Sequence, residues 1–186
     1  MPRQFILASG SQRRQELLSQ MGVPFELYVP EVDERLNGSA EQVVVELARR
    51  KALEAARVYP KAAVLAADTL VTIEGEVLGK PQDLFDAARM LRRLSGAWHE
   101  VHTGVCLVVD SAAEFAHVKT DVLFSNMTED EIRLYCDSGE PLGKAGAYAI
   151  QGLGGMFIQQ IHGNYTNVVG LPTSVVYQML KKANIL

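Results

Sequence analysis

Residues 5–18 read FILASGSQRRQELL and predict a strand, a short turn and a helix in direct succession. The apolar run over 3–8 is typical of a buried strand. Ser11 is the expected N-cap of a helix over 11–21, and Gly22 is its expected stop. Such a turn is an anion site, because unpaired backbone N–H groups and the helix dipole both point at it.

Two arginines, Arg13 and Arg14, lie in the first turn of this helix. Cations there are repelled by the positive end of the helix dipole, at a cost of about 0.3–1 kcal/mol each. A bound polyphosphate would reverse that repulsion, since a guanidinium grips phosphate oxygens through paired donors. The alternative is a solvated pair on an exposed helix face, and the residues alone leave both interpretations open.

The rest of the chain predicts strands that alternate with helices. Helices are expected after the capping boxes Ser39/Gln42 (to about Val58) and Thr128/Glu131 (129–138), after Asp83 (84–95, with Phe85, Ala88, Leu91 and Leu94 at helical spacing) and after a Thr173 cap. Strands are expected over Phe25–Val29, through AAVLAADTLVTI and over 97–109 and 114–125, with further strands broken by turns in the glycine-rich segment 139–171. This alternation predicts an α/β protein with a mixed sheet, whose final helix packs back on the first lobe.

Length and composition suit one soluble domain over residues 1–186. The chain has 186 residues, of which 48% are hydrophobic and 22% charged, and its formal net charge of −4 argues against a partner such as duplex DNA or long RNA. Cys106 and Cys136 have no metal or redox spacing, which favours buried thiols in a reducing compartment. Because no apolar run reaches about 18 residues and the chain enters a strand at once, we expect no membrane span, no signal peptide and a cytoplasmic location.

One carboxylate, Asp68, lies inside the apolar run LAADTL. A buried carboxylate costs several kcal/mol unless it is paired, protonated or bound to a metal, and ligands gather at strand ends in α/β sheets. The alternative is a strand-terminal residue that caps the next turn. Glu31, Asp33 and Glu34 form an acidic loop that could hold a hard divalent cation or could simply be solvated.

Several lysines stand at the edges of predicted elements. Lys80 lies in LGKP (78–81), Lys51 lies in ARRKALEAA, and Lys144 lies in LGKAGAY. Each residue alone is as consistent with a surface lysine as with an anion ligand. Residues 139–145 are one residue short of a P-loop and lack its Ser/Thr, so this class of nucleotide site is excluded.

The whole chain resembles the Maf family of nucleoside triphosphate pyrophosphatases. The resemblance covers about residues 5–172 and rests on an ordered set of motifs: LASGSQRRQELL, EVDE, AADTLV, LGKPQD, HTGV, GKAGAYAIQGLGG and VVGLP. It implies an elongated mixed-sheet α/β fold with two lobes around a central cleft, usually in a homodimer. It also implies cleavage of a nucleoside triphosphate between its α- and β-phosphates with a divalent cation such as Mg²⁺, Mn²⁺ or Co²⁺.

The resemblance assigns roles that the residues alone leave open. Asp68 corresponds to the general base that activates water, and Glu34 to a partner carboxylate on the metal or the water; both are implied metal ligands. The implied phosphate-binding residues are Ser9, Arg13, Arg14, Lys51 and Lys80. Lys80 is also an implied catalytic residue. These residues explain why arginines stand in the first turn of a helix, since the ligand there is strongly negative.

Base choice is a separate implication. Arg13, Thr69 and Gln151 fall where the dTTP- and UTP-preferring branch of the family has its specificity residues. A glutamine amide can accept from the N3–H of uracil or thymine and donate to a neighbouring carbonyl oxygen, whereas cytosine would leave a group unpaired at about 1–3 kcal/mol. Two positions depart from the family pattern: Gln12 stands where proline is usual, and Gly143 stands where aspartate is usual, which removes a candidate partner of Lys144.

Two other functions are consistent with parts of this pattern. An inosine or xanthosine triphosphate pyrophosphatase shares the reaction and a similar two-lobed fold, but has a purine pocket. A nucleotide-sensing regulator of cell division would need no catalysis, so the presence of Asp68, Glu34 and Lys80 favours an enzyme. The resemblance therefore implies hydrolysis of dTTP and UTP, with modified pyrimidine nucleotides as a further substrate class.

Overall fold

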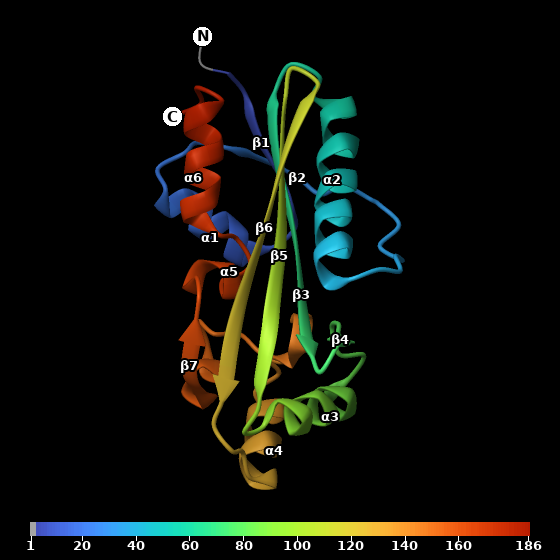
Figure 1. Cartoon of the computed structure of the whole chain (residues 1–186), viewed down its shortest axis with the longest axis vertical. Coiled ribbons are helices and arrows are strands. Elements are labelled where there is room, and N and C mark those ends of the chain that lie inside the picture. The colour runs from blue at the N-terminus through green and yellow to red at the C-terminus, as the bar shows by residue number, and fades with distance from the viewer. Residues whose placement is uncertain (1–2) are drawn as a thin grey trace. The chain divides into compact units, whose positions relative to one another are not determined.

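The structure is a computed structural model that describes residues 3–186; Met1 and Pro2, which the expected domain includes, lie outside the described residues. Its strands are β1 (Phe5–Ala8), β2 (Glu26–Tyr28), β3 (Ala63–Ile73), β4 (Glu76–Leu78), β5 (Trp98–Val109), β6 (Ala112–Phe124) and β7 (Ile158–His162). Its helices are α1 (Gln12–Gln20), α2 (Ala40–Val58), α3 (Leu84–Leu94), α4 (Glu129–Asp137), α5 (Tyr165–Val169) and α6 (Thr173–Lys182), with 3-10 turns η1 (Ala145–Ala147) and η2 (Leu153–Phe157). Figure 1 labels these elements.

The described strands form one mixed sheet in the order β2-β1-β3-β5-β6-β7, with β4 paired to β3. Strand β1 is parallel to β2 and β3, whereas β4 and β7 are antiparallel to β3 and β6. Strands β5 and β6 are joined by Asp110 and Ser111 alone, both at positive φ, as a tight hairpin turn requires. The expected mixed α/β sheet with flanking helices is therefore confirmed.

The chain divides into two compact units. The first contains the residues up to Asp68 together with Thr103–Val118 and Gly170–Leu186, and the second contains Thr69–His102 and Lys119–Val169. Because α6 belongs to the first unit, the expected return of the final helix is confirmed. Among residues 3–186, no helix combines the length and apolar character that a membrane crossing requires.

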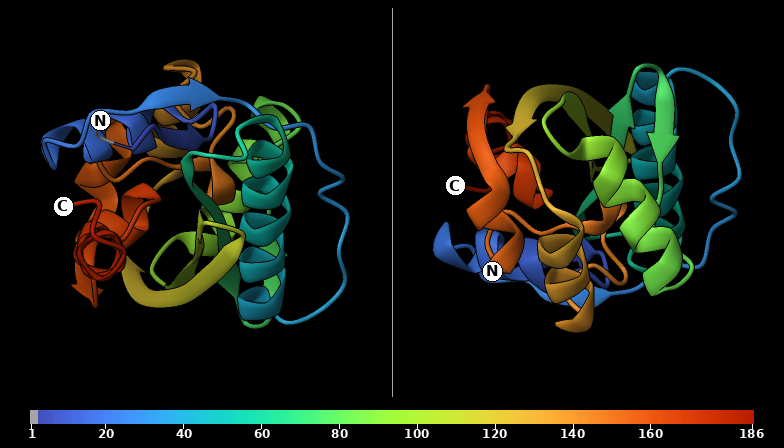
Figure 2. Two further views of the ribbon diagram at one scale, coloured as in Figure 1. Left: turned by 90° about the horizontal axis from the view of Figure 1, so that it is seen from above. Right: turned by 90° about the horizontal axis from the view of Figure 1, so that it is seen from below.

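In the first unit, α2 covers one face of the sheet while α1 and α6 lie on the other (Figures 1 and 2). The core on the α2 side is rich in small residues, since Ala48, Ala52 and Ala55 are fully buried against strand residues such as Ile6 and Val64. Side chains at this spacing share one face of a helix. The alanine face allows α2 to lie close to the sheet.

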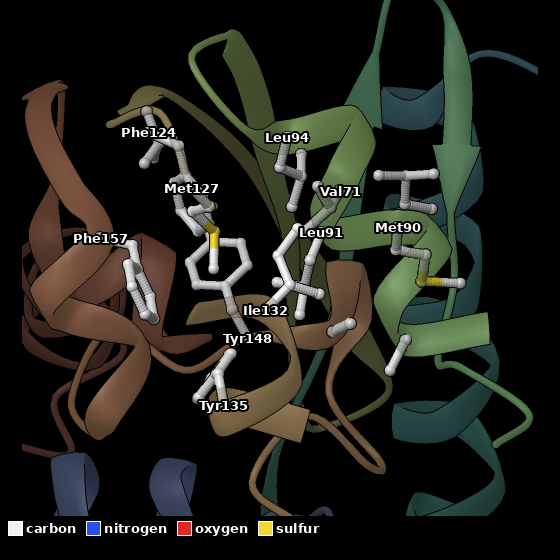
Figure 3. Close-up of a cluster of buried hydrophobic side chains, with 14 of the residues drawn as sticks. Val71, Met90, Leu91, Leu94, Phe124, Met127, Ile132, Tyr135, Tyr148 and Phe157 are labelled. Carbon is white, nitrogen blue, oxygen red and sulfur yellow. The ribbon is translucent and has the colours of Figure 1, made fainter. Parts of the chain in front are cut away.

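The second unit has a core of aliphatic and aromatic side chains, part of which is drawn in Figure 3. Leu91 and Leu94 of α3 are buried there as expected, but Phe85 is 80% exposed. Ala87 and Met90 complete the buried face of α3 instead. The buried face of α3 is therefore rotated about the helix axis relative to the predicted face. In a short helix, apolar residues at helical spacing are consistent with more than one orientation.

Two expectations about the C-terminal third are wrong. The glycine-rich segment 139–171 contains only one strand, β7, together with η1, η2 and α5. Its glycines favour tight turns over extended backbone. Thr173 is the first residue of α6 rather than its cap, because the carbonyl of Pro172 accepts the first helical bonds from Val175 and Val176.

Candidate active site

Ser9 and Arg14 are joined by a hydrogen bond at the turn between β1 and α1. Ser9 is buried, and its Oγ accepts hydrogen bonds from the backbone N–H of Ser11 (3.1 Å) and from Nη1 of Arg14 (3.4 Å). Ser11 occupies the N-cap but its side chain makes no capping hydrogen bond. Ser9 therefore orders the turn, and the N-terminus of α1 lacks a side-chain cap from Ser11.

Arg14 is fixed within the first unit from two sides. Besides its bond to Ser9, its Nε donates to the carbonyl oxygen of Gly170 at 2.7 Å. Burial lowers the pKa of the Arg14 guanidinium below its ordinary value, although the negative charges of Asp68 and Glu34 favour the charged form. The structure therefore brings Arg14 into the electrostatic field of both candidate catalytic carboxylates.

Lys51 connects those two carboxylates. From α2, its Nζ lies 2.6 Å from Oδ1 of Asp68 on β3 and 2.7 Å from Oε1 of Glu34. The side chains of Lys51 and Asp68 are each only 13% exposed, whereas that of Glu34 is 54% exposed. Asp68 is therefore paired rather than isolated in its apolar strand, and one ammonium stands where the two carboxylates converge.

The close approach of α2 to the sheet depends on Gly104 in the HTGV motif. A Cβ on this residue would lie 2.4 Å from both the carbonyl carbon and the carbonyl oxygen of Val44. Glycine at this position lets the backbone of α2 contact β5 directly. Because Lys51 lies on the same helix, the spacing that Gly104 permits also helps to place its Nζ against Asp68.

The acidic loop does not converge as one cluster. Asp33 accepts hydrogen bonds from the backbone N–H and Nε of Arg35, while Glu34 faces Lys51. No group of three or more His, Cys, Asp or Glu side chains in residues 3–186 is arranged to hold a metal ion. Glu34 and Asp68 are thus two carboxylates with a common cationic neighbour, a donor set of the kind that Mg²⁺ uses together with substrate phosphates and water.

Of the other predicted site residues, Arg13 is half-buried in α1 of the first unit, whereas Thr69, Lys80 and Gln151 belong to the second unit. Thr69 is half-buried in β3, and Lys80 and Gln151 are exposed. The loop that holds Lys80 is attached to η1, since the carbonyl oxygen of Gly79 accepts from the N–H of Gly146 at 3.1 Å.

Sequence reasoning missed three contributors. The carbonyl of Gly170 fixes Arg14 across 156 residues of chain, which no local pattern indicates. In the second unit, Glu140 and Tyr135 hold the loop that carries Gln151. The sequence did contain one signal for Glu140, since it is the only charged residue in the Gly/Pro-rich run SGEPLG (138–143). Lys144 donates to the carbonyl oxygens of Glu140 and Leu142 and so stabilises its own turn.

The chain is similar to known proteins along almost its whole length. A family model described as Maf-like protein matches residues 4–183. A protein of Symbiobacterium thermophilum named dTTP/UTP pyrophosphatase is 51% identical over 180 residues, which is 96% of this chain and 93% of that protein. Proteins with the same name from Acinetobacter baylyi (46% over 178 residues; 95% and 97%) and Bacillus anthracis (47% over 185 residues; 98% and 97%) are similarly close.

Proposed function

This chain belongs to the Maf family, and on that premise we propose that it is a nucleoside triphosphate pyrophosphatase acting on dTTP and UTP. The observation that carries the proposal is that Lys51 pairs with both Asp68 and Glu34, and that the charges of these carboxylates act on Arg14 in the first turn of α1. Phosphoryl transfer requires this combination, in which a carboxylate lies near positively charged side chains that can bind phosphate.

In the proposed reaction, water attacks the α-phosphorus and the bond from that phosphorus to the oxygen bridging to the β-phosphate breaks. Asp68 accepts the proton of the water, and pyrophosphate leaves with the bridging oxygen. Ser9, Arg13 and Arg14 would bind the phosphates at the turn before α1, and Lys80 would add a further cation. Lys51 would hold the Asp68 carboxylate in place and contact phosphate when the substrate is bound.

A divalent cation fits the donors available in the first unit. Glu34 and Asp68 would hold it, and substrate phosphates and water would complete its coordination. The cation would neutralise phosphate charge that develops in the transition state. We include Mg²⁺, Mn²⁺ and Co²⁺ as candidates for this role.

For base choice, we propose that Gln151 reads the N3–H and a carbonyl oxygen of uracil or thymine, with Arg13 and Thr69 as further specificity residues. Modified pyrimidine nucleotides with the same edge would also be substrates. We further propose a cytoplasmic homodimer; the two buried free cysteines, Cys106 and Cys136, are in keeping with a reducing compartment.

The test is pyrophosphate release across dTTP, UTP, CTP, GTP, ITP and XTP with each metal and with a chelator. We expect dTTP and UTP to give equal amounts of monophosphate and pyrophosphate, and the chelator to abolish release. Preference for ITP or XTP would replace this proposal with the purine enzyme. No release from any nucleotide would overturn it, and light scattering in solution tests the homodimer.

A further inference from the structure

The loop over 149–155, which carries Gln151, is attached to a single carboxylate. Oε1 of Glu140 accepts from the N–H of Gly154 at 2.9 Å, and Oε2 accepts from the N–H of Leu153 at 2.9 Å. Glu140 thus binds two consecutive backbone amides that follow Gln151 by two and three residues. These two hydrogen bonds fix the backbone at Leu153 and Gly154. The side chain of Gln151 takes no part in them.

Tyr135 fixes the other end of the loop and the carboxylate itself. Its hydroxyl donates to Oε1 of Glu140 at 2.7 Å and accepts from the N–H of Ala149 at 3.2 Å. Tyr135 is 2% exposed and belongs to the core drawn in Figure 3, where its ring packs against Phe157 at 5.6 Å between centroids. The anchor of the loop is therefore part of the rigid interior of the second unit.

The loop backbone lies directly against this pair. A Cβ on Gly152 would lie 2.1 Å from Oε2 of Glu140, and a Cβ on Gly154 would lie 2.5 Å from the hydroxyl of Tyr135. Side chains at these positions would displace the loop from its anchor. Gly152 and Gly154 are therefore explained by the approach of the backbone to Glu140 and Tyr135, and Gly155 by its approach to the carbonyl oxygen of Ile150.

The anchor is charged at neutral pH. Burial opposes the charge of Glu140, but the N–H of Gly154, the hydroxyl of Tyr135 and the N–H of Leu153 outweigh it, so the pKa of Glu140 lies below its ordinary value. Hydrogen bonds to a charged acceptor are about twice as strong as neutral ones. An uncharged isostere at this position should therefore loosen the loop without removing a side chain from the core.

We propose that Glu140, held by Tyr135, is a positioning residue that fixes the loop of Gln151 and thereby sets the base selectivity of the enzyme. The inference rests on the function proposed above, because Gln151 matters only if a base is read there. Glu140 touches backbone rather than substrate, so its effect is on the ratio between nucleotides. A change at Glu140 should leave binding and cleavage of the phosphate groups, which every nucleoside triphosphate shares, unaltered.

The test compares Glu140→Gln and Tyr135→Phe with the wild type and with Glu129→Gln. Glu129 is an exposed residue of α4 that pairs with Arg92, so it controls for loss of a surface carboxylate nearby. The readouts are kcat/KM for UTP, dTTP and CTP, thermal stability, and hydrogen exchange of the Leu153 and Gly154 amides by NMR. The double variant measures coupling between the two side chains.

We expect Glu140→Gln to lower kcat/KM for UTP and dTTP by up to about tenfold, no more than a direct change at Gln151, because Glu140 acts only through the position of that side chain. The loss should appear mainly in KM, CTP should change little, and both amides should exchange faster. Tyr135→Phe should act in the same direction and not add to Glu140→Gln. Glu129→Gln should match the wild type in all readouts.

An unchanged UTP-to-CTP ratio in Glu140→Gln would overturn the inference, and so would an equal loss on all three nucleotides together with a lower melting temperature. If the wild type releases no pyrophosphate, the proposed function is rejected. The inference is then tested by binding alone, by comparing the ratio of the dissociation constants for UTP and CTP between the wild type and Glu140→Gln. An unaltered ratio, or no nucleotide binding by the wild type, rejects it.

Discussion

The two units hold their candidate site residues in different ways. In the first, charged side chains from separate elements pair with one another, as Lys51 does with Asp68 and Glu34. In the second, one half-buried carboxylate, Glu140, holds a backbone loop. Ion pairs can exchange partners when a charged ligand arrives, whereas a loop bound through its amides keeps its shape. The first arrangement suits phosphate chemistry, which is common to all nucleotides, and the second suits discrimination between bases.

The largest expected effect is in the first unit, at Asp68. Asp68→Asn keeps the size of the side chain but removes the proton acceptor, so we expect kcat to fall by about 10²–10⁴-fold while nucleotide binding persists. Single-turnover pyrophosphate release and equilibrium binding measure the two effects separately. Asp33→Asn, which alters the acid paired with Arg35, is the matched control. Near-normal turnover in Asp68→Asn would remove this residue from the mechanism.

A pH titration sharpens the comparison, because the second unit buries a neutral histidine. Burial lowers the pKa of His99 to about 4, and His99 lies 2.8 Å from the Tyr148 hydroxyl. The unfolded chain binds a proton here below about pH 6.5 and the folded protein does not. The contribution of His99 to stability is thus fully present above pH 6.5 and is lost as the pH falls towards 4, a loss of about 3 kcal/mol.

The measurement is the free energy of unfolding in urea from pH 7 to 4, followed by the fluorescence of Trp98, the one tryptophan of the chain, which lies in the second unit. His99→Gln should flatten the decline relative to the wild type, and His162→Gln, an exposed position, should not. Parallel pH curves for the wild type and His99→Gln would contradict the prediction.

The third prediction concerns the phosphate contacts. Arg14→Ala or Lys80→Ala should lower kcat/KM by about tenfold to a hundredfold, since hydrogen bonds to charged groups contribute about 1.5–3 kcal/mol. The loss should be equal for every triphosphate, because phosphates carry no base identity. Arg14 also binds the Gly170 carbonyl, so the exposed Lys80 gives the variant with less structural risk. A changed base preference at retained overall efficiency would show that these residues do something else.

The smallest expected effect is confined to base choice in the second unit. Gln151→Glu replaces a donating amide with an acceptor that would face a carbonyl oxygen of the base, so kcat/KM for dTTP and UTP should fall by about tenfold. Guanine nucleotides, which can donate to a carboxylate, should lose less or gain. Steady-state kinetics with dTTP, UTP, CTP, GTP and ITP measure the change. Full pyrimidine preference in the variant would exclude Gln151 from the base pocket.

Features decided within a few residues were predictable from the sequence. Both capping boxes are present with the expected partners, Ser39 with Gln42 and Thr128 with Glu131. Asp83 also caps α3 as expected. These bonds join residues three apart, so their geometry follows from the helix itself. In the glycine-rich segment, where the expected strands are mostly absent, Tyr135 and Glu140 hold the backbone at Ala149 and Gly154, and local patterns do not contain these contacts.

By itself, the sequence determined the strand, turn and helix of residues 5–20, the unusual placement of Arg13 and Arg14, and the buried carboxylate Asp68. Only the tertiary structure decided which partners these groups have. The ammonium of Lys51 reaches Asp68 from another element, and the Gly170 carbonyl reaches Arg14 across 156 residues of chain. The physical reason is that helix and turn preferences act between near neighbours in the chain, whereas ion pairs and buried hydrogen bonds depend on how closely distant elements pack.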